Sequence, residues 1–101
     1  MSLSVAITSL HFNGGSSIRV EWRNAPTATR VLLERDVENT RKGRISVVLV
    51  DNSNVALPRS FTDQTVFNDH INNSNCIYVL TNWDAQNNMG TSSVRINLDE
   101  L

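Results

Sequence analysis

The stretch Cys76–Leu98, CIYVLTNWDAQNNMGTSSVRINL, alternates between apolar and polar residues near both of its ends. Cys76–Trp83 and Thr91–Leu98 each show the two-residue period of a β-strand that buries one face. Residues 84–90 between them are rich in asparagine, which favours turns over regular structure. The stretch therefore predicts two strands separated by a turn, with Trp83 at the end of the first strand.

The same alternation recurs along the rest of the chain, and turn residues separate the runs at short intervals. Ser17–Arg23 is the clearest run, whereas Arg44–Val50 is apolar on both faces. Strands are also expected at residues 3–12, 29–37 and 58–66. About seven short strands without a helical period predict an all-β fold, a two-sheet antiparallel β-sandwich. A closed barrel of the same strands is the alternative arrangement.

Length and charge narrow the class of protein. The 101 residues suit one domain spanning residues 1–101, and Met1–Leu3 are also compatible with a short leader added for expression. The net charge of −1 gives no electrostatic reason to expect binding to nucleic acid. No segment approaches the roughly 20 apolar residues of a membrane-inserted helix. A single cysteine, Cys76, excludes an intrachain disulfide.

Three motifs follow one another in a recognisable order. Ile18-x-Val20-x-Trp22 precedes a proline-containing loop, Phe61–Val66 reads FTDQTV, and alternate positions from residue 76 to 84 hold Cys, Tyr, Leu, Asn and Asp. In this order the chain resembles the fibronectin type III family, which has an immunoglobulin-like sandwich, over nearly its whole length. The resemblance implies that the third, fourth, sixth and seventh strands share one sheet. It also implies that the loops at 24–29 and 84–91 lie near one pole.

The chain departs from the family pattern at three positions. Cys76 stands where the family has a corner tyrosine, so the hydroxyl bond that pins the preceding loop is missing. Asn82 replaces a small apolar core residue and needs hydrogen-bond partners if it is buried. Gly90 comes a few residues later than in the family.

The alignment of residues 76–84 with the family pattern also predicts a candidate interaction face. If Cys76, Tyr78 and Leu80 point into the core, alternation places the intervening residues on the outer face of the sheet, as an apolar strip that ends in Trp83. This face comprises Ile77, Val79, Thr81 and Trp83. Possible loop contacts are Asn24, Thr27, Asp84, Gln86, Asn87 and Asn88. For Trp83 alone, the alternative is that residues 86–91 cover its ring.

The leading hypothesis is a non-catalytic protein-interaction or spacer module, part of a larger protein. Its partner would be another protein, a neighbouring domain or a second copy bound through the outer face. The compartment stays open, and the resemblance favours a secreted or cell-surface context. A carbohydrate-binding module is a second hypothesis, which requires Trp83 to be exposed together with Tyr78 or Trp22.

A calcium-binding βγ-crystallin-like domain is the third hypothesis. Asn87–Ser92 fits the string (N/D)(N/D)-x-x-(S/T)-S of that family, and Phe67–Ile71 fits half of it. Apart from this string no metal site is expected. The acidic candidates are scattered along the chain and are predicted to be solvated turn carboxylates: Asp51, Asp63, Asp69 and Asp84.

No cofactor, catalytic residue or enzymatic activity is expected. His11 and His70 lie in no nucleophile motif and are predicted to be surface loop histidines, and Cys76 is predicted to be a buried thiol.

Overall fold

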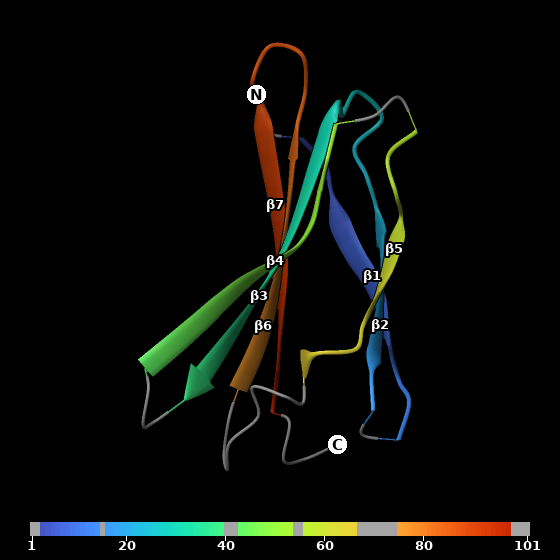
Figure 1. The fold of residues 1–101 in the computed structure, drawn as a ribbon. Coiled ribbons are helices and arrows are strands. Elements are labelled where there is room, and N and C mark those ends of the chain that lie inside the picture. The colour runs from blue at the N-terminus through green and yellow to red at the C-terminus, as the bar shows by residue number, and fades with distance from the viewer. Residues whose placement is uncertain (1–2, 15, 40–42, 54–55, 67–74, 98–101) are drawn as a thin grey trace.

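A computed structural model of the chain describes residues 3–14, 16–39, 43–53, 56–66 and 75–97. These residues form seven strands: β1 (Ala6–Phe12), β2 (Ile18–Arg23), β3 (Arg30–Asn39), β4 (Gly43–Asn52), β5 (Ser60–Asp63), β6 (Asn75–Trp83) and β7 (Met89–Asn97). One sheet has the strand order β1-β2-β5 and the other β4-β3-β6-β7, with antiparallel pairing throughout (Figure 1). The predicted two-sheet sandwich is confirmed, as is the grouping of β3, β4, β6 and β7. Leu98, the predicted end of the last strand, lies outside the described residues.

The core lies between the two sheets and consists of the side chains that alternation placed inward. Leu33 of β3 lies opposite Leu80 of β6 in the register of the larger sheet, and Trp22 of β2 joins the same core cluster from the smaller sheet. The buried core residues are Ile18, Val20, Trp22, Val31, Leu33, Val66, Cys76, Tyr78 and Leu80. Burial of each large apolar side chain contributes about 1.5–3 kcal/mol, so this layer supplies the main stabilisation.

A β-bulge explains why β4 is apolar on both faces in sequence. Leu33 of β3 lies opposite Val50, but the next residue of β3 lies opposite Val48, so Leu49 is an extra residue on β4. Leu49 and Val50 both pack against the core. Val48 points outward and keeps 58% of its surface exposed. The bulge therefore turns two successive apolar side chains inward and leaves one outside.

A buried ion pair links the two sheets through the core. Nη1 of Arg35 on β3 donates to both carboxylate oxygens of Asp63 on β5, at 2.9 and 2.7 Å, and both side chains are almost fully buried. Tyr78 of β6 donates its hydroxyl to the same carboxylate at 3.0 Å. Burial alone would raise the pKa of Asp63, but bonds from Arg35 and from Thr65 hold it below its ordinary value. The prediction that Asp63 is a solvated turn carboxylate is therefore wrong.

The segment before β1 and the start of β1 cover part of the β7 edge. The Leu3 amide donates to the Met89 carbonyl at 3.2 Å, and the Ile7 amide donates to the Ser92 hydroxyl at 3.1 Å. Gly90 is buried beneath this segment, and a Cβ atom there would lie 2.2 Å from the Leu3 carbonyl oxygen. Only glycine allows so close an approach of the two backbones.

Candidate functional site

The four outward residues predicted on β6 lie on the face of the larger sheet that is turned away from the core. The residues between them, from Cys76 to Asn82, are buried inward. Ile77, Val79 and Trp83 are half-buried, whereas Thr81 is only 6% exposed. Thr81 lies between Leu32 of β3 and Thr91 of β7 in the sheet register, which explains its burial. Whether this face binds anything stays a prediction.

Charged side chains interrupt the apolar strip that the sequence predicted. Glu34 of β3 lies between Val79 of β6 and Val48 of β4 in the sheet register. In the neighbouring row, Ile77 lies between Asp36 of β3 and Arg95 of β7. The outer face is therefore a mixed surface, because alternate residues of β3 bring carboxylates to it.

The end of the face nearest the 84–88 turn carries a cluster with a different chemistry. The guanidinium carbon of Arg30 lies 4.6 Å from the centroid of the Trp83 ring. Arg30 also donates to both carboxylate oxygens of Asp51, at 3.0 and 3.1 Å. Met89 lies beside Trp83 across β6 and β7 and is 50% exposed. Arg30, Asp51, Trp83 and Met89 are called the Trp83 cluster below.

Electrostatics stabilises this arrangement. The hydrogen bonds from Arg30 to Asp51, together with the charge of that carboxylate, raise the pKa of Arg30, so the guanidinium stays charged over the Trp83 ring. The Trp83 ring therefore makes a cation–π contact with Arg30 of β3. Tryptophan, arginine and methionine are the residue types enriched where proteins bind one another.

The loop at 24–29 lies beside the end of β6, as the resemblance implied. The Thr29 amide donates to the Trp83 carbonyl at 2.7 Å, and the Ala25 amide donates to Asn82 Oδ1 at 2.8 Å. Asn82 is fully buried and also donates to Asn24 Oδ1 at 3.1 Å, so its predicted need for partners is met. Thr27 is exposed at the tip of the loop.

Asn24 serves the structure of the loop. Its Oδ1 also accepts a hydrogen bond from Trp22 Nε1 at 3.0 Å, and its Nδ2 donates to the Pro58 carbonyl at 2.9 Å. These bonds join β2, β6 and the segment before β5. Any ligand contact through Asn24 would have to leave these bonds in place.

The turn between β6 and β7 is held together by Asp84. Its Oδ1 accepts hydrogen bonds from the amides of Gln86 and Asn88, both at 2.9 Å, and its Oδ2 accepts one from Asn88 Nδ2. These bonds, the Asn88 side-chain bond first, hold the pKa of Asp84 below its ordinary value. Asn87 has a φ of 63°, the left-handed conformation that closes a three-residue hairpin loop.

This turn changes the interpretation of the predicted loop contacts. Asp84 is 8% exposed and Asn88 is half-buried, so Asp84 is no solvated carboxylate and both side chains stabilise the turn. Gln86, Asn87 and Thr27 are exposed and are the accessible members of the set.

A polar cluster on the other sheet was missed by the sequence analysis. Glu21 Oε1 of β2 accepts a hydrogen bond from the Ser9 hydroxyl at 3.0 Å and contacts His11 Nε2. The bond from Ser9 and then the contact with His11 lower the pKa of Glu21. His11 is exposed, as expected, but lies in β1 rather than in a loop; His70 lies outside the described residues. The alternation of side chains along β1 and β2 places these three residues on one face, and this pattern could have revealed the cluster in the sequence.

The Ser9, His11 and Glu21 side chains do not have the geometry of a hydrolytic triad. Ser9 and Glu21 both approach the same nitrogen of His11, whereas a triad needs the acid on the opposite nitrogen.

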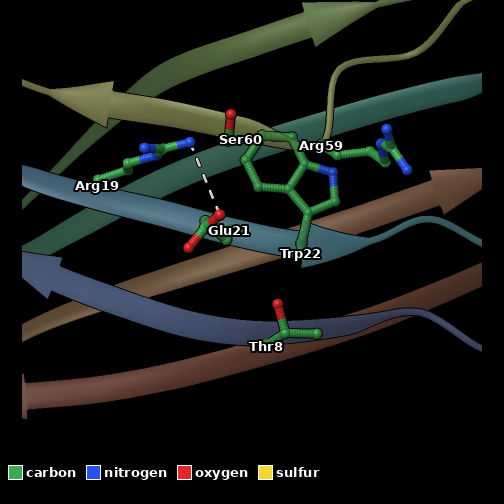
Figure 2. Close-up of a pocket in the computed structure, with 6 residues that line it drawn as sticks. All are labelled: Thr8, Arg19, Glu21, Trp22, Arg59 and Ser60. Atoms are coloured by element: carbon green, nitrogen blue, oxygen red, sulfur yellow. Dashed lines mark ion pairs between the residues drawn. The ribbon is translucent and has the colours of Figure 1, made fainter.

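An open pocket of about 340 Å³ lies beside Glu21 on this sheet (Figure 2). It is lined by Thr8, Arg19, Glu21, Trp22, Arg59 and Ser60. Within the described ranges no three His, Cys, Asp or Glu side chains group as a metal site would require.

Geometry bears on the two other binding hypotheses. Tyr78 and Trp22 are buried, as predicted, and Arg30 lies over the Trp83 ring. These three rings therefore do not form the exposed pair that the carbohydrate-binding hypothesis requires. In the string Asn87–Ser92, the Ser92 hydroxyl already accepts the Ile7 amide, which leaves it poorly placed for calcium. Phe67–Ile71, the second half-motif, lies outside the described residues.

The Cys76 thiol is buried, as the sequence predicted. Cys76 is fully buried, and burial raises its pKa to about 12, so the thiol is protonated at neutral pH.

The part of the chain that the structure describes contains no helix with the length and hydropathy of a membrane span.

The comparisons with known proteins bear on the fold. No protein-family model matches the chain, and a search of curated proteins returns no match. Its structure is similar to the crystal structure of a Fn3-like protein from Clostridium thermocellum, with a TM-score of 0.50 and 17% sequence identity. The alignment covers 93% of this chain and 82% of that chain. Together with the observed strand order, this similarity confirms the resemblance at the level of the fold: the chain is a fibronectin type III-like β-sandwich.

Proposed function

We propose that this β-sandwich is a non-catalytic module that binds a protein partner, or a neighbouring domain, through the outer face of the β4-β3-β6-β7 sheet. The observation that carries the proposal is the Trp83 cluster. It gathers a half-buried tryptophan, a stacked arginine and a methionine that is 50% exposed at one end of an open sheet face.

Energetics favours this end of the face as the centre of binding. Arg30 is already oriented by Asp51 and by the Trp83 ring, so its side chain loses little conformational freedom when a partner covers it. A buried tryptophan or arginine of this kind typically contributes about 2 kcal/mol or more to a protein interface. Glu34 and the exposed loop residues Thr27 and Gln86 would form the polar rim around it.

The module is proposed to be part of a larger secreted or cell-surface protein, in which it acts as a spacer or a binding unit. This setting follows from the family resemblance alone. The proposal includes no catalytic step.

The test compares three immobilised chains as baits for proteins of the source cell: the wild type, Trp83→Ala and the control Phe12→Ala. Phe12 is a suitable control because it is also an exposed aromatic residue, 46% exposed, but lies on the other sheet. The expected result is a protein retained by the wild type and the Phe12 variant and lost from the Trp83 variant. Equal retention by all three baits, or no retention by the wild type, contradicts the proposal.

Stability must be measured alongside binding, because the argument requires Trp83 to be a surface residue. Trp83→Ala should lower the free energy of unfolding by about 1 kcal/mol or less, the scale of surface substitutions, together with the lost stacking on Arg30. If Trp83→Ala instead unfolds the chain, Trp83 belongs to the core and the proposed interface is wrong.

A further inference from the structure

The turn between β1 and β2 holds the one asparagine–glycine pair of the sequence, Asn13–Gly14. The Ser16 amide donates to the Asn13 carbonyl at 3.0 Å, and the Asn13 amide donates to the Ser17 carbonyl at 3.0 Å. Gly14 has a φ of 57°, the left-handed conformation that glycine adopts without strain. The turn therefore presents an exposed asparagine that is followed by a residue without a side chain.

The backbone nitrogen of Gly14 is accessible for a reaction with the Asn13 side chain. Within the described part of the chain, the Gly14 amide donates no hydrogen bond, and no heavy atom beyond its chain neighbours lies within 4 Å of the position that a Cβ would take. A backbone nitrogen that has lost its proton attacks the amide carbon, Cγ, of a preceding asparagine, and a side chain on the attacking residue hinders this approach. Asn13 Nδ2 donates to the Ser17 hydroxyl at 3.0 Å, and water can replace this single bond when the side chain turns toward Gly14.

Two hydrogen bonds favour the loss of the proton from this nitrogen. When the Gly14 amide loses its proton, the negative charge spreads onto the carbonyl oxygen of the same peptide group, which belongs to Asn13. That oxygen accepts hydrogen bonds from the Ser16 amide at 3.0 Å and from the Ser16 hydroxyl at 2.6 Å. Donors that already point at the atom where negative charge develops lower the barrier to the step that forms it.

We propose that Asn13 is a site of spontaneous modification, at which it cyclises onto the Gly14 nitrogen and is then hydrolysed to aspartate or isoaspartate, and that the Ser16 hydroxyl assists the first step. Hydroxide from the solvent takes the proton of the Gly14 amide, and the nitrogen forms a bond to Asn13 Cγ. The Cγ–Nδ2 bond breaks, and Nδ2 takes a proton from water and leaves as ammonia. Water then opens the succinimide ring at either of its carbonyl carbons. Opening at the backbone carbonyl leaves the main chain running through Cγ, which is isoaspartate.

Asn87 provides a comparison within the same chain, because it is also exposed and also has a positive φ in a hairpin turn. The residue that follows it, Asn88, carries a side chain, and the Asn88 amide donates to Asp84 Oδ1 at 2.9 Å. The attacking nitrogen is therefore hindered and already bonded at this turn, whereas at Asn13 it is neither.

The modification affects the smaller sheet and is independent of the proposed function. Isoaspartate lengthens the backbone of the turn by a methylene group, which disturbs the bonds of Asn13 to Ser16 and Ser17. It also adds a carboxylate to the turn. The Trp83 cluster lies on the other sheet and should keep its structure.

Peptide mapping by mass spectrometry, after incubation of the folded chain in a mildly alkaline buffer, tests where the modification occurs. We expect aspartate and isoaspartate to accumulate at position 13 at least about tenfold faster than at Asn87. Gly14→Ala adds a methyl group to the attacking residue and should slow the reaction at Asn13 by about tenfold or more. A rate at Asn13 that does not exceed the rate at Asn87, or that is unchanged in Gly14→Ala, overturns the proposal.

Ser16→Ala tests the role of the hydroxyl without a change at either reacting residue. It should slow the modification of Asn13 by about two- to tenfold, the effect of one lost hydrogen bond, whereas the matched control Ser17→Ala should not slow it. In urea the folded turn is absent, so Ser16→Ala and the wild type should react at equal rates. An unchanged or faster rate in folded Ser16→Ala, an equal fall in Ser17→Ala, or a difference that persists in urea overturns the role of the Ser16 hydroxyl.

Discussion

Replacement of Asp63 by asparagine tests the buried ion pair that joins the two sheets. The substitution keeps the shape of the side chain but removes its charge, so the Arg35 guanidinium, 0% exposed, loses the counter-charge that Asp63 supplies in the core. The new amide also turns a donor toward Tyr78 or Thr65, both of which donate to Asp63 in the native protein. Breaking a buried pair in this way costs about 3–5 kcal/mol.

Urea unfolding near pH 7 measures this cost as a fall in the midpoint at constant slope. Asp51→Asn is the matched control, because Asp51 also binds an arginine through both oxygens, but with both side chains nearly half exposed. An exposed pair contributes about 0–1 kcal/mol. If Asp63→Asn costs no more than Asp51→Asn, the buried pair does not stabilise the sandwich and the reasoning is wrong.

Acid should reduce the difference between the wild type and Asp63→Asn. The folded-state pKa of Asp63 lies below its ordinary value of 3.8, so the unfolded chain takes up the proton first as the pH falls. The stabilisation by this carboxylate is therefore complete above about 3.8 and is lost as the pH falls through the folded-state pKa. A gap in unfolding free energy that stays constant below that pH would contradict this assignment.

Three further substitutions or reactions test the core and the β7 edge. Trp22→Ala should cost about 3–5 kcal/mol of unfolding free energy, and a loss below about 1 kcal/mol would show that the ring is not core. Gly90→Ala places a Cβ atom 2.2 Å from the Leu3 carbonyl oxygen and should cost about 1–3 kcal/mol in urea unfolding; an unchanged midpoint would refute this contact. The Cys76 thiol, with its pKa raised to about 12, should react with a thiol reagent at neutral pH only after unfolding, and rapid labelling of the folded chain would contradict its burial.

Local alternation was enough to predict the strands, the inward residues and the arrangement in two sheets. Ser17–Arg23 illustrates why: successive side chains of any strand point to opposite faces, so a run such as Ile18, Val20 and Trp22 defines the core side before any partner is known. The same rule placed Trp83 on the outer face. It did not reveal that Arg30 would lie over the Trp83 ring, because that contact depends on the β3–β6 register.

The errors in the sequence analysis concern carboxylates that were expected to be solvated but are buried and hydrogen-bonded. Asp63 lies in the strand expected at residues 58–66 and was interpreted as solvated, but Arg35, 28 residues earlier, pairs with it in the core. Asp84 looked like a loop carboxylate, yet the backbone of its own turn encloses it. The charge of an aspartate is therefore a weak indicator of exposure when hydrogen-bond donors lie close to it in the folded chain.

The sequence by itself determined the all-β class, the inward faces of the strands and the family resemblance, because a two-residue period is a local property of the chain. Only the tertiary structure decided which polar residues are buried, which edge of each sheet is covered and where the Trp83 cluster forms. Asn82 and Ala25 are 57 residues apart, and Leu3 reaches Gly90 from the opposite end of the chain. Such contacts follow from how the two sheets pack, and packing depends on the whole chain at once.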